Sequence, residues 1–242
     1  MKLTTCLLVG VWMSWAFTGP TRATEPTDAG SISGTVTFQG KVPEPQKLKV
    51  DKDLEICGQH EKYSEELLVS ETGGLENVVI QLVGAKGVVT IPKGKDRPSI
   101  TQKECQFSPH VQVVPAGTRM SIFNEDGIAH NIHTLGVENP SFNQQQPGIK
   151  KRMVTKKNDF AVPEMIPIKC DIHQWMKAWI VVADHPFHAV SDDGGAFKIS
   201  GVPAGTYTVE FWHETLGKQT QEVTVKPGAD VEVQAVFKAK KS

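Results

Sequence analysis

The sequence has almost no net charge, few cysteines and little helical patterning. Its 26 lysines and arginines nearly balance its 27 aspartates and glutamates, which leaves a formal net charge of −1. A chain without a basic excess gives no general indication of nucleic-acid binding. No apolar run in the sequence reaches the about 20 residues that a membrane-spanning helix needs. The composition therefore points away from both nucleic-acid-binding proteins and integral membrane proteins.

The first 23 residues have the features of a secretory signal peptide. Lys2 supplies a positive charge, Cys6–Phe17 is an apolar run, and residues 21–23 place small residues at the −3 and −1 positions of a cleavage site. An uncleaved membrane anchor is the alternative, but it needs a longer apolar run. We therefore expect a mature protein that begins near Thr24, is periplasmic or extracellular, and has no transmembrane segment.

Short apolar runs between turn residues dominate the rest of the chain, which holds 21 glycines and 15 prolines. Apolar and polar residues alternate along many segments, with a turn signal about every 8 to 12 residues, which is typical of antiparallel β-sandwiches. The sequence therefore predicts an all-β fold. We divide it into residues 1–23 (signal peptide), 24–100 (an N-terminal β extension packed on the next unit), 101–183 (a first sandwich) and 184–242 (a smaller second sandwich).

The cysteine count raises a question that metal binding would answer. Without the signal peptide, the chain holds Cys57, Cys105 and Cys170. Three cysteines in an exported protein allow one disulfide and leave one thiol, which is prone to oxidation. We expect a Cys57–Cys105 disulfide, and the alternative is that these two bind metal with His60 or His110. Metal ligation would account for the remaining thiol.

The strongest chemical signal is the C-x₂-H-x₂-M spacing of Cys170, His173 and Met176. One further imidazole would complete a His₂Cys plane with a weak axial methionine, which is the blue-copper arrangement. We prefer His130 as that imidazole, since His133 lies three residues on and faces the other way in an extended strand. The sequence thus predicts one copper ion, cycling between Cu(I) and Cu(II). Zinc, or ordinary core packing without metal, are the alternatives.

The surrounding segment carries a family resemblance. F-x-P at Phe107, P-A-G-T from Pro115, N-x-D…H-N from Asn124 and the cysteine motif follow in order before Val182. This part of the chain resembles the cupredoxin family, which includes plastocyanin and amicyanin, and its short ligand loop is similar to the amicyanin type. The resemblance implies a Greek-key β-sandwich. It also implies that the copper ligands are His130, Cys170, His173 and Met176.

A second resemblance covers the C-terminal part. A D-x-G-x-F motif ends at Phe197, and a V-P-x-G-x-Y motif ends at Tyr207. Together they predict turns and a tyrosine that packs on the core. They resemble the carboxypeptidase regulatory-like and rhamnogalacturonan-lyase-associated modules, which are fibronectin type III-like β-sandwiches. Such a resemblance implies a fold and no activity. His185, His213 and Glu214 in this part form either a second metal site or a hydrogen-bond network.

These features predict a one-electron carrier that is not an enzyme. Electrons would pass through Trp175 and an exposed edge of His173 to a redox partner protein. The basic run Lys150–Lys157 either steers an acidic partner or is a solvated loop.

Two other classes of function stay open. The chain could handle copper without redox cycling, or bind carbohydrate or a partner through its sandwiches. A copper enzyme such as a nitrite reductase would need a second, open copper site, for which the candidate histidines are His185, His188 and His213.

Overall fold

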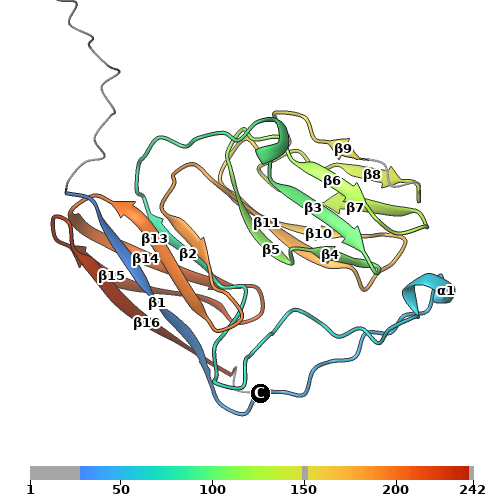
Figure 1. Ribbon diagram of the computed structural model, residues 1–242, viewed down its shortest axis with the longest axis horizontal. Coiled ribbons are helices and arrows are strands. Elements are labelled where there is room, and N and C mark those ends of the chain that lie inside the picture. Colours follow the sequence, from blue (N-terminus) through green and yellow to red (C-terminus); the bar gives the residue numbers. More distant parts are fainter. Residues whose placement is uncertain (1–27, 149–151, 240–242) are drawn as a thin grey trace, which may run out of the picture.

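The computed structural model describes residues 28–148 and 152–239, whose regular secondary structure is almost all β-strand (Figure 1). Helix in these residues is confined to α1 (Leu54–Cys57) and the 3₁₀ turn η1 (Gly94–Asp96). The all-β prediction is therefore confirmed. The predicted signal peptide lies outside the described residues. Within the described ranges, no helix has both the length and the hydropathy to cross a membrane.

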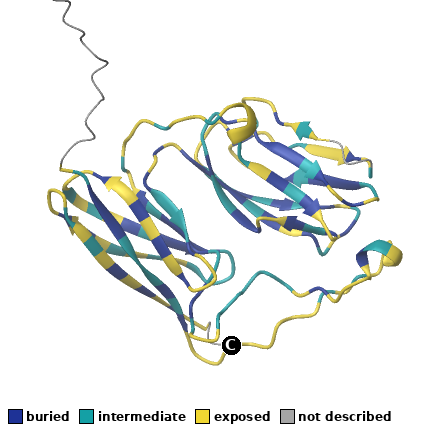
Figure 2. Cartoon of the chain, in the orientation of Figure 1, coloured by how far each residue is buried: buried dark blue, intermediate teal, exposed yellow. Residues whose placement is uncertain are grey.

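The strands form two sandwiches. The central sandwich has sheets in the order β5-β11-β10-β7-β8 and β4-β3-β6-β9. Its strands are β3 (Ser99–Lys103), β4 (Gln106–Ser108), β5 (Val111–Pro115), β6 (Ser121–Asn124), β7 (His130–Thr134), β8 (Asn143–Gln146), β9 (Met153–Val154), β10 (Glu164–Lys169) and β11 (Lys177–Ala183). The alternation in β10 turns Ile166 and Ile168 into the core, where both are buried. Figure 2 shows buried and more exposed residues alternating along many of the strands.

The outer sandwich has sheets in the order β13-β1-β16 and β12-β2-β14-β15. Its strands are β1 (Gly30–Gln39), β2 (Val79–Val83), β12 (His188–Val190), β13 (Ala196–Val202), β14 (Gly205–His213), β15 (Gly217–Val225) and β16 (Asp230–Lys238). Ile32, Val36, Phe197 and Phe211 are among the buried residues that fill its core.

The structure corrects the expected place of the N-terminal extension. Residues 24–100 were expected to pack on the first sandwich, residues 101–183, but β1 pairs with β13 and β16, and β2 pairs with β12 and β14. Without β1 and β2, the strands β12, β13, β14 and β16 would each expose an unpaired edge. β1 and β2 pair with these edges and so complete the two sheets. The central sandwich is therefore inserted between β2 and β12 of the outer one. Alternation alone could not reveal this, because it sets which face of a strand is apolar and not which strand lies beside it.

The middle of the extension reaches the central sandwich near the candidate metal centre. There Val50, Ile56 and Cys57 pack on its core, and Cys57 forms a disulfide with Cys105, 48 residues away. The predicted disulfide is thus confirmed. It fixes α1 against the turn between β3 and β4.

Candidate metal centre

The strand order brings the predicted ligands together. β10 pairs antiparallel with β7, with Lys169 opposite His133, so the chain beyond Lys169 passes beside the start of β7. His130 is the first residue of β7, and Cys170 directly follows β10. His173 lies in the loop that returns to β11. Three residues from two separate segments therefore meet at one end of the central sandwich.

His130, Cys170 and His173 form a buried cluster. One ligand atom from each lies within 4.8 Å of those of the other two. His130 Nδ1 is 2.9 Å from His173 Nδ1, and Cys170 Sγ is 3.8 Å from His173 Nδ1. Met176 is also buried and packs in the same core cluster as Cys170. His133 lies outside the cluster, where its Nδ1 is 2.9 Å from Asp171 Oδ2.

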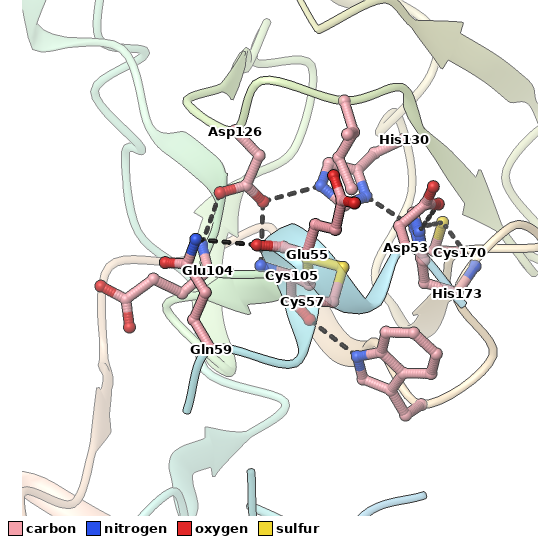
Figure 3. Close-up of a disulfide and its surroundings, with 12 residues drawn as sticks. Asp53, Glu55, Cys57, Gln59, Glu104, Cys105, Asp126, His130, Cys170 and His173 are labelled. Carbon is pink, nitrogen blue, oxygen red and sulfur yellow. Dashed lines mark hydrogen bonds and ion pairs between the residues drawn. A yellow bond between two sulfur atoms is a disulfide. The ribbon is translucent and has the colours of Figure 1, made fainter. Parts of the chain in front are cut away.

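Each ligand imidazole is held by a carboxylate on its far side (Figure 3). His130 Nε2 is 2.7 Å from Asp126 Oδ2, and His173 Nε2 is 2.8 Å from Asp53 Oδ2. Asp126 is fixed in turn by the backbone N–H groups of Glu104 and Cys105. A carboxylate at Nε2 favours the tautomer with a free Nδ1 lone pair, which is the arrangement of metal-binding histidines.

These two carboxylates were not foreseen from the sequence. Asp126 belongs to the N-x-D motif, which offered a signal that it lies close to His130. Asp53 lies 120 residues from His173 and carries no local signal at all.

Asn131 ties the two ligand segments together. Its Oδ1 accepts hydrogen bonds from Asp171 N at 2.8 Å, from Ile172 N at 3.2 Å and from the Cys170 thiol at 3.2 Å. The backbone N–H of His173 also donates to Cys170 Sγ, at 3.3 Å. Hydrogen bonds to the sulfur restrict its position and stabilise a thiolate.

The electrostatics of the cluster favour metal-binding protonation states at two residues. Burial raises the pKa of the Cys170 thiol, but hydrogen bonds from His130 and nearby backbone groups outweigh it, so the net pKa is lowered. Burial lowers the pKa of His173 more than Asp53 raises it, so that ring favours its neutral form. At His130, Asp126 and Cys170 outweigh burial and raise the pKa. A metal ion would compete there with a proton.

The structure corrects the expected exposure of His173. Its side chain is 0% exposed because Asp53, next to α1, covers its Nε2. Trp175 packs on its ring with centroids 5.1 Å apart and donates from Nε1 to the Cys105 carbonyl at 3.0 Å. The disulfide-anchored extension therefore closes the imidazole edge that was expected to exchange electrons.

The donor set fits a copper ion. One thiol and two imidazole nitrogens converge in a buried place, and copper in both oxidation states accepts these donors. A second group of Cys105, Asp126 and His130 also lies within 4.8 Å, but Cys105 is in the disulfide and offers no thiolate.

Of the two alternatives for His185, His213 and Glu214, a second metal site finds no support in the part of the chain that the structure describes. His185 lies against Phe187, His213 against Phe237, and no potential metal-binding group among the described residues includes them. Burial lowers the pKa of His213 to about 4. His188, the third candidate for a second copper, also has its pKa lowered by burial to about 4. The Glu214 carboxylate instead forms hydrogen bonds with the His110 ring and with Trp179 Nε1, both in the central sandwich.

The His110–Glu214 contact predicts pH-dependent stability. Burial alone would lower the pKa of His110 and raise that of Glu214. Their mutual hydrogen bond and charge attraction, with smaller contributions from Glu65 at His110 and from Trp179 at Glu214, together outweigh burial, so the His110 pKa is raised and the Glu214 pKa is lowered. The His110 contribution is full below its ordinary pKa of 6.5 and disappears as the pH rises through the raised value. The Glu214 contribution is present above 4.5 and disappears as the pH falls through the lowered value.

Glu214→Gln should therefore destabilise the protein by about 2 kcal/mol near pH 5.5, and by less above pH 8. Chemical denaturation at several pH values measures this. The control is Glu222→Gln, at an exposed position of the same sandwich. An equal loss at every pH would contradict the charge-based explanation.

Comparison with known proteins agrees with part of the sequence analysis. A family model described as the carboxypeptidase regulatory-like domain matches residues 177–238. This segment matches that domain family. The match covers β11 of the central sandwich and the strands β12 to β16 of the outer one, and it misses β1 and β2, which come from far earlier in the chain. Among curated proteins, none matches the chain.

Solved structures with similar folds include copper proteins. A Cu-containing nitrite reductase from Thermus scotoductus SA-01 is 26% identical, with a TM-score of 0.33 over 42% of this chain and 24% of its own. This chain thus spans about a quarter of that enzyme. A purple cupredoxin from Nitrosopumilus maritimus (21% identity, TM-score 0.30) covers 36% of this chain and 99% of its own. An oxidised mutant of amicyanin is 11% identical, with a TM-score of 0.33, and the match covers 43% of this chain and 98% of the amicyanin chain. Such TM-scores assign no activity, so the metal hypothesis depends on the side chains.

Proposed function

We propose that this chain holds one copper ion through His130, Cys170, His173 and Met176 and transfers single electrons. The main observation behind this proposal is that one thiol and two imidazole Nδ1 atoms lie close together in a buried place. The Nε2 atom of each imidazole ring is held by a carboxylate. Bound copper would supply the one-electron chemistry by changing between Cu(I) and Cu(II).

The protein's contribution is a site that changes little between oxidation states. Asp126 and Asp53 fix the two rings, and Asn131 fixes the loop that carries Cys170. The side chains of His130 and His173 are both 0% exposed, so water is excluded. Ligands that cannot move make the reorganisation during electron transfer small.

The same proposal includes export and a redox partner. A structural disulfide is typical of proteins in an oxidising compartment, so we place the protein in the periplasm or outside the cell. Because His173 is covered, we place electron exchange at the pocket lined by Lys169, Cys170, Asp171 and Gln174. There a partner protein can approach the Cys170 sulfur.

Copper loading of the metal-free protein tests the proposal. We expect one copper per chain, a strong absorption band at about 600 nm from thiolate-to-Cu(II) charge transfer, and reversible bleaching by a one-electron reductant. A colourless Cu(II) protein would contradict electron transfer at this site. Two coppers per chain would favour an enzyme.

Copper handling without redox cycling is the second candidate, because the burial of His173 removes the exposed imidazole edge through which electrons were expected to pass. A Cu(I) chelator distinguishes the two. A carrier retains its copper after reduction, whereas a protein that delivers copper releases it.

Asp53 should tune the reduction potential. Its carboxylate lies one imidazole ring away from the ligand atom of His173 and favours Cu(II) over Cu(I). A unit charge at such a separation is worth about 1–3 kcal/mol, which partial exposure reduces, so Asp53→Asn should raise the potential by about 50 mV. The control Asp51→Asn removes an exposed charge two residues away that pairs with Lys49. Voltammetry giving equal shifts for both variants would show that the contact with His173 has no special effect.

A further inference from the structure

A basic pocket lies in the central sandwich away from the metal centre. It has a volume of about 580 Å³, and its charged lining consists of Lys93, Arg97, Arg119 and Lys157. The remaining lining residues are Val89, Ile91, Pro92 and Gly117. No acidic side chain lines it. A pocket of this size, half apolar and half cationic, has the proportions of a small-ligand site.

Backbone hydrogen bonds hold the cationic segments next to one another. Ser121 N donates to Pro98 O at 2.9 Å, which joins the neighbours of Arg97 and Arg119. Thr155 N donates to Met120 O at 3.0 Å and so brings the segment of Lys157 to the same place.

The apolar wall is attached to the same scaffold. Gly117 N donates to Phe160 O at 2.6 Å. Gly117 has φ +76° and sits against Ile91, whose Cδ1 would be 3.7 Å from an added Cβ. The pocket is therefore built where three segments meet, residues 89–97, residues 117–119 and Lys157.

The four charged side chains lack a close carboxylate partner in the part of the chain that the structure describes, and Asp96, next to Arg97, does not line the pocket. None of them belongs to an ion pair there. The nearby carboxylate of Asp159 accepts a hydrogen bond from Lys156 N at 2.6 Å and does not line the pocket. Like charges held together repel one another, and a bound anion would remove that repulsion. The chain as a whole has a net charge of only −1, so this concentration of positive charge is local.

The pocket is independent of the proposed copper site. Arg119 lies just before β6, whereas Asp126, which holds His130, follows the other end of that strand. The two sites thus lie at opposite ends of the sandwich, and a ligand in this pocket would not touch the metal ligands.

We propose that this pocket binds a small organic oxyanion, a dicarboxylate or a phosphate monoester, with an apolar body. The guanidinium groups of Arg97 and Arg119 suit paired hydrogen bonds to carboxylate or phosphate oxygens, and the lysines add charge. The apolar part of the ligand packs on Ile91 and Pro92.

Titration calorimetry on the full chain tests this with two probes, phthalate and phenyl phosphate, and with benzyl alcohol as the uncharged control. We expect saturable binding of at least one anion and none of the alcohol. The double variant Arg97→Gln/Arg119→Gln should bind at least about tenfold more weakly, since each charge-assisted hydrogen bond is worth about that factor. Lys95→Gln, an exposed η1 position outside the lining, should change binding by less than about twofold.

Three outcomes would overturn the proposal. They are no saturable binding of either anion, equal weakening by Lys95→Gln, and binding only to a long polyanion such as heparin. Binding of phthalate alone or of phenyl phosphate alone would support it and identify the charged group. Unchanged copper spectra in the double variant would show that its effect is confined to this pocket.

Discussion

We expect Cys170→Ser to abolish the absorption band at about 600 nm and to weaken copper binding by at least about 100-fold. The sulfur is the only thiolate available to the cluster, because the other described cysteines form the disulfide. A serine hydroxyl is close in size but offers no soft anionic donor. Absorption and electron paramagnetic resonance spectra of the copper-loaded variant measure the loss.

A pair of histidine variants provides the matched control. His130→Gln should also lose the band, whereas His133→Gln should keep it, since His133 is turned toward Asp171. Thermal unfolding of the metal-free variants checks that each one is folded. A band that survives Cys170→Ser, or that disappears equally in both histidine variants, would refute the ligand assignment.

The second large effect is expected from removing the disulfide with Cys57→Ala/Cys105→Ala. Closing a loop of 48 residues stabilises a protein by about 4 kcal/mol in the chain-entropy model. Both sulfurs are 0% exposed, so lost packing adds to this figure. Denaturation by guanidinium chloride, with copper absent, measures the change in the free energy of unfolding.

The same variant should also disturb the metal centre. The disulfide anchors α1, whose neighbour Asp53 holds His173, and Cys105 N donates to Asp126 at 2.8 Å. We expect faster loss of copper to a chelator than from the wild type. Asp51→Asn, which leaves these contacts intact, is the control for charge in the extension. Wild-type rates of copper loss combined with lower stability would show that the extension stabilises the fold without guarding the site.

The sequence by itself determined the local features of this protein. Period-two alternation and turn residues specified the strands, because burial of one face fixes side-chain direction residue by residue. The odd cysteine count and the C-x₂-H-x₂-M spacing pointed to Cys170, His173 and Met176 as candidate ligands, since three potential ligands occupy one short loop. The choice of His130 over His133 followed from the same period, and the structure places His130 in the cluster.

Tertiary structure alone decided what depends on pairing between distant segments. An alternating strand carries no record of its neighbour, so the insertion of the central sandwich between β2 and β12 was not foreseeable. Asp53 reaches His173 across 120 residues, and this contact buries an edge that the sequence led us to expect in solvent. The basic pocket likewise gathers Arg97, Arg119 and Lys157 through backbone hydrogen bonds between separate segments. Local sequence sets which residues can bind, whereas the packing of remote segments sets which of them meet and which remain exposed.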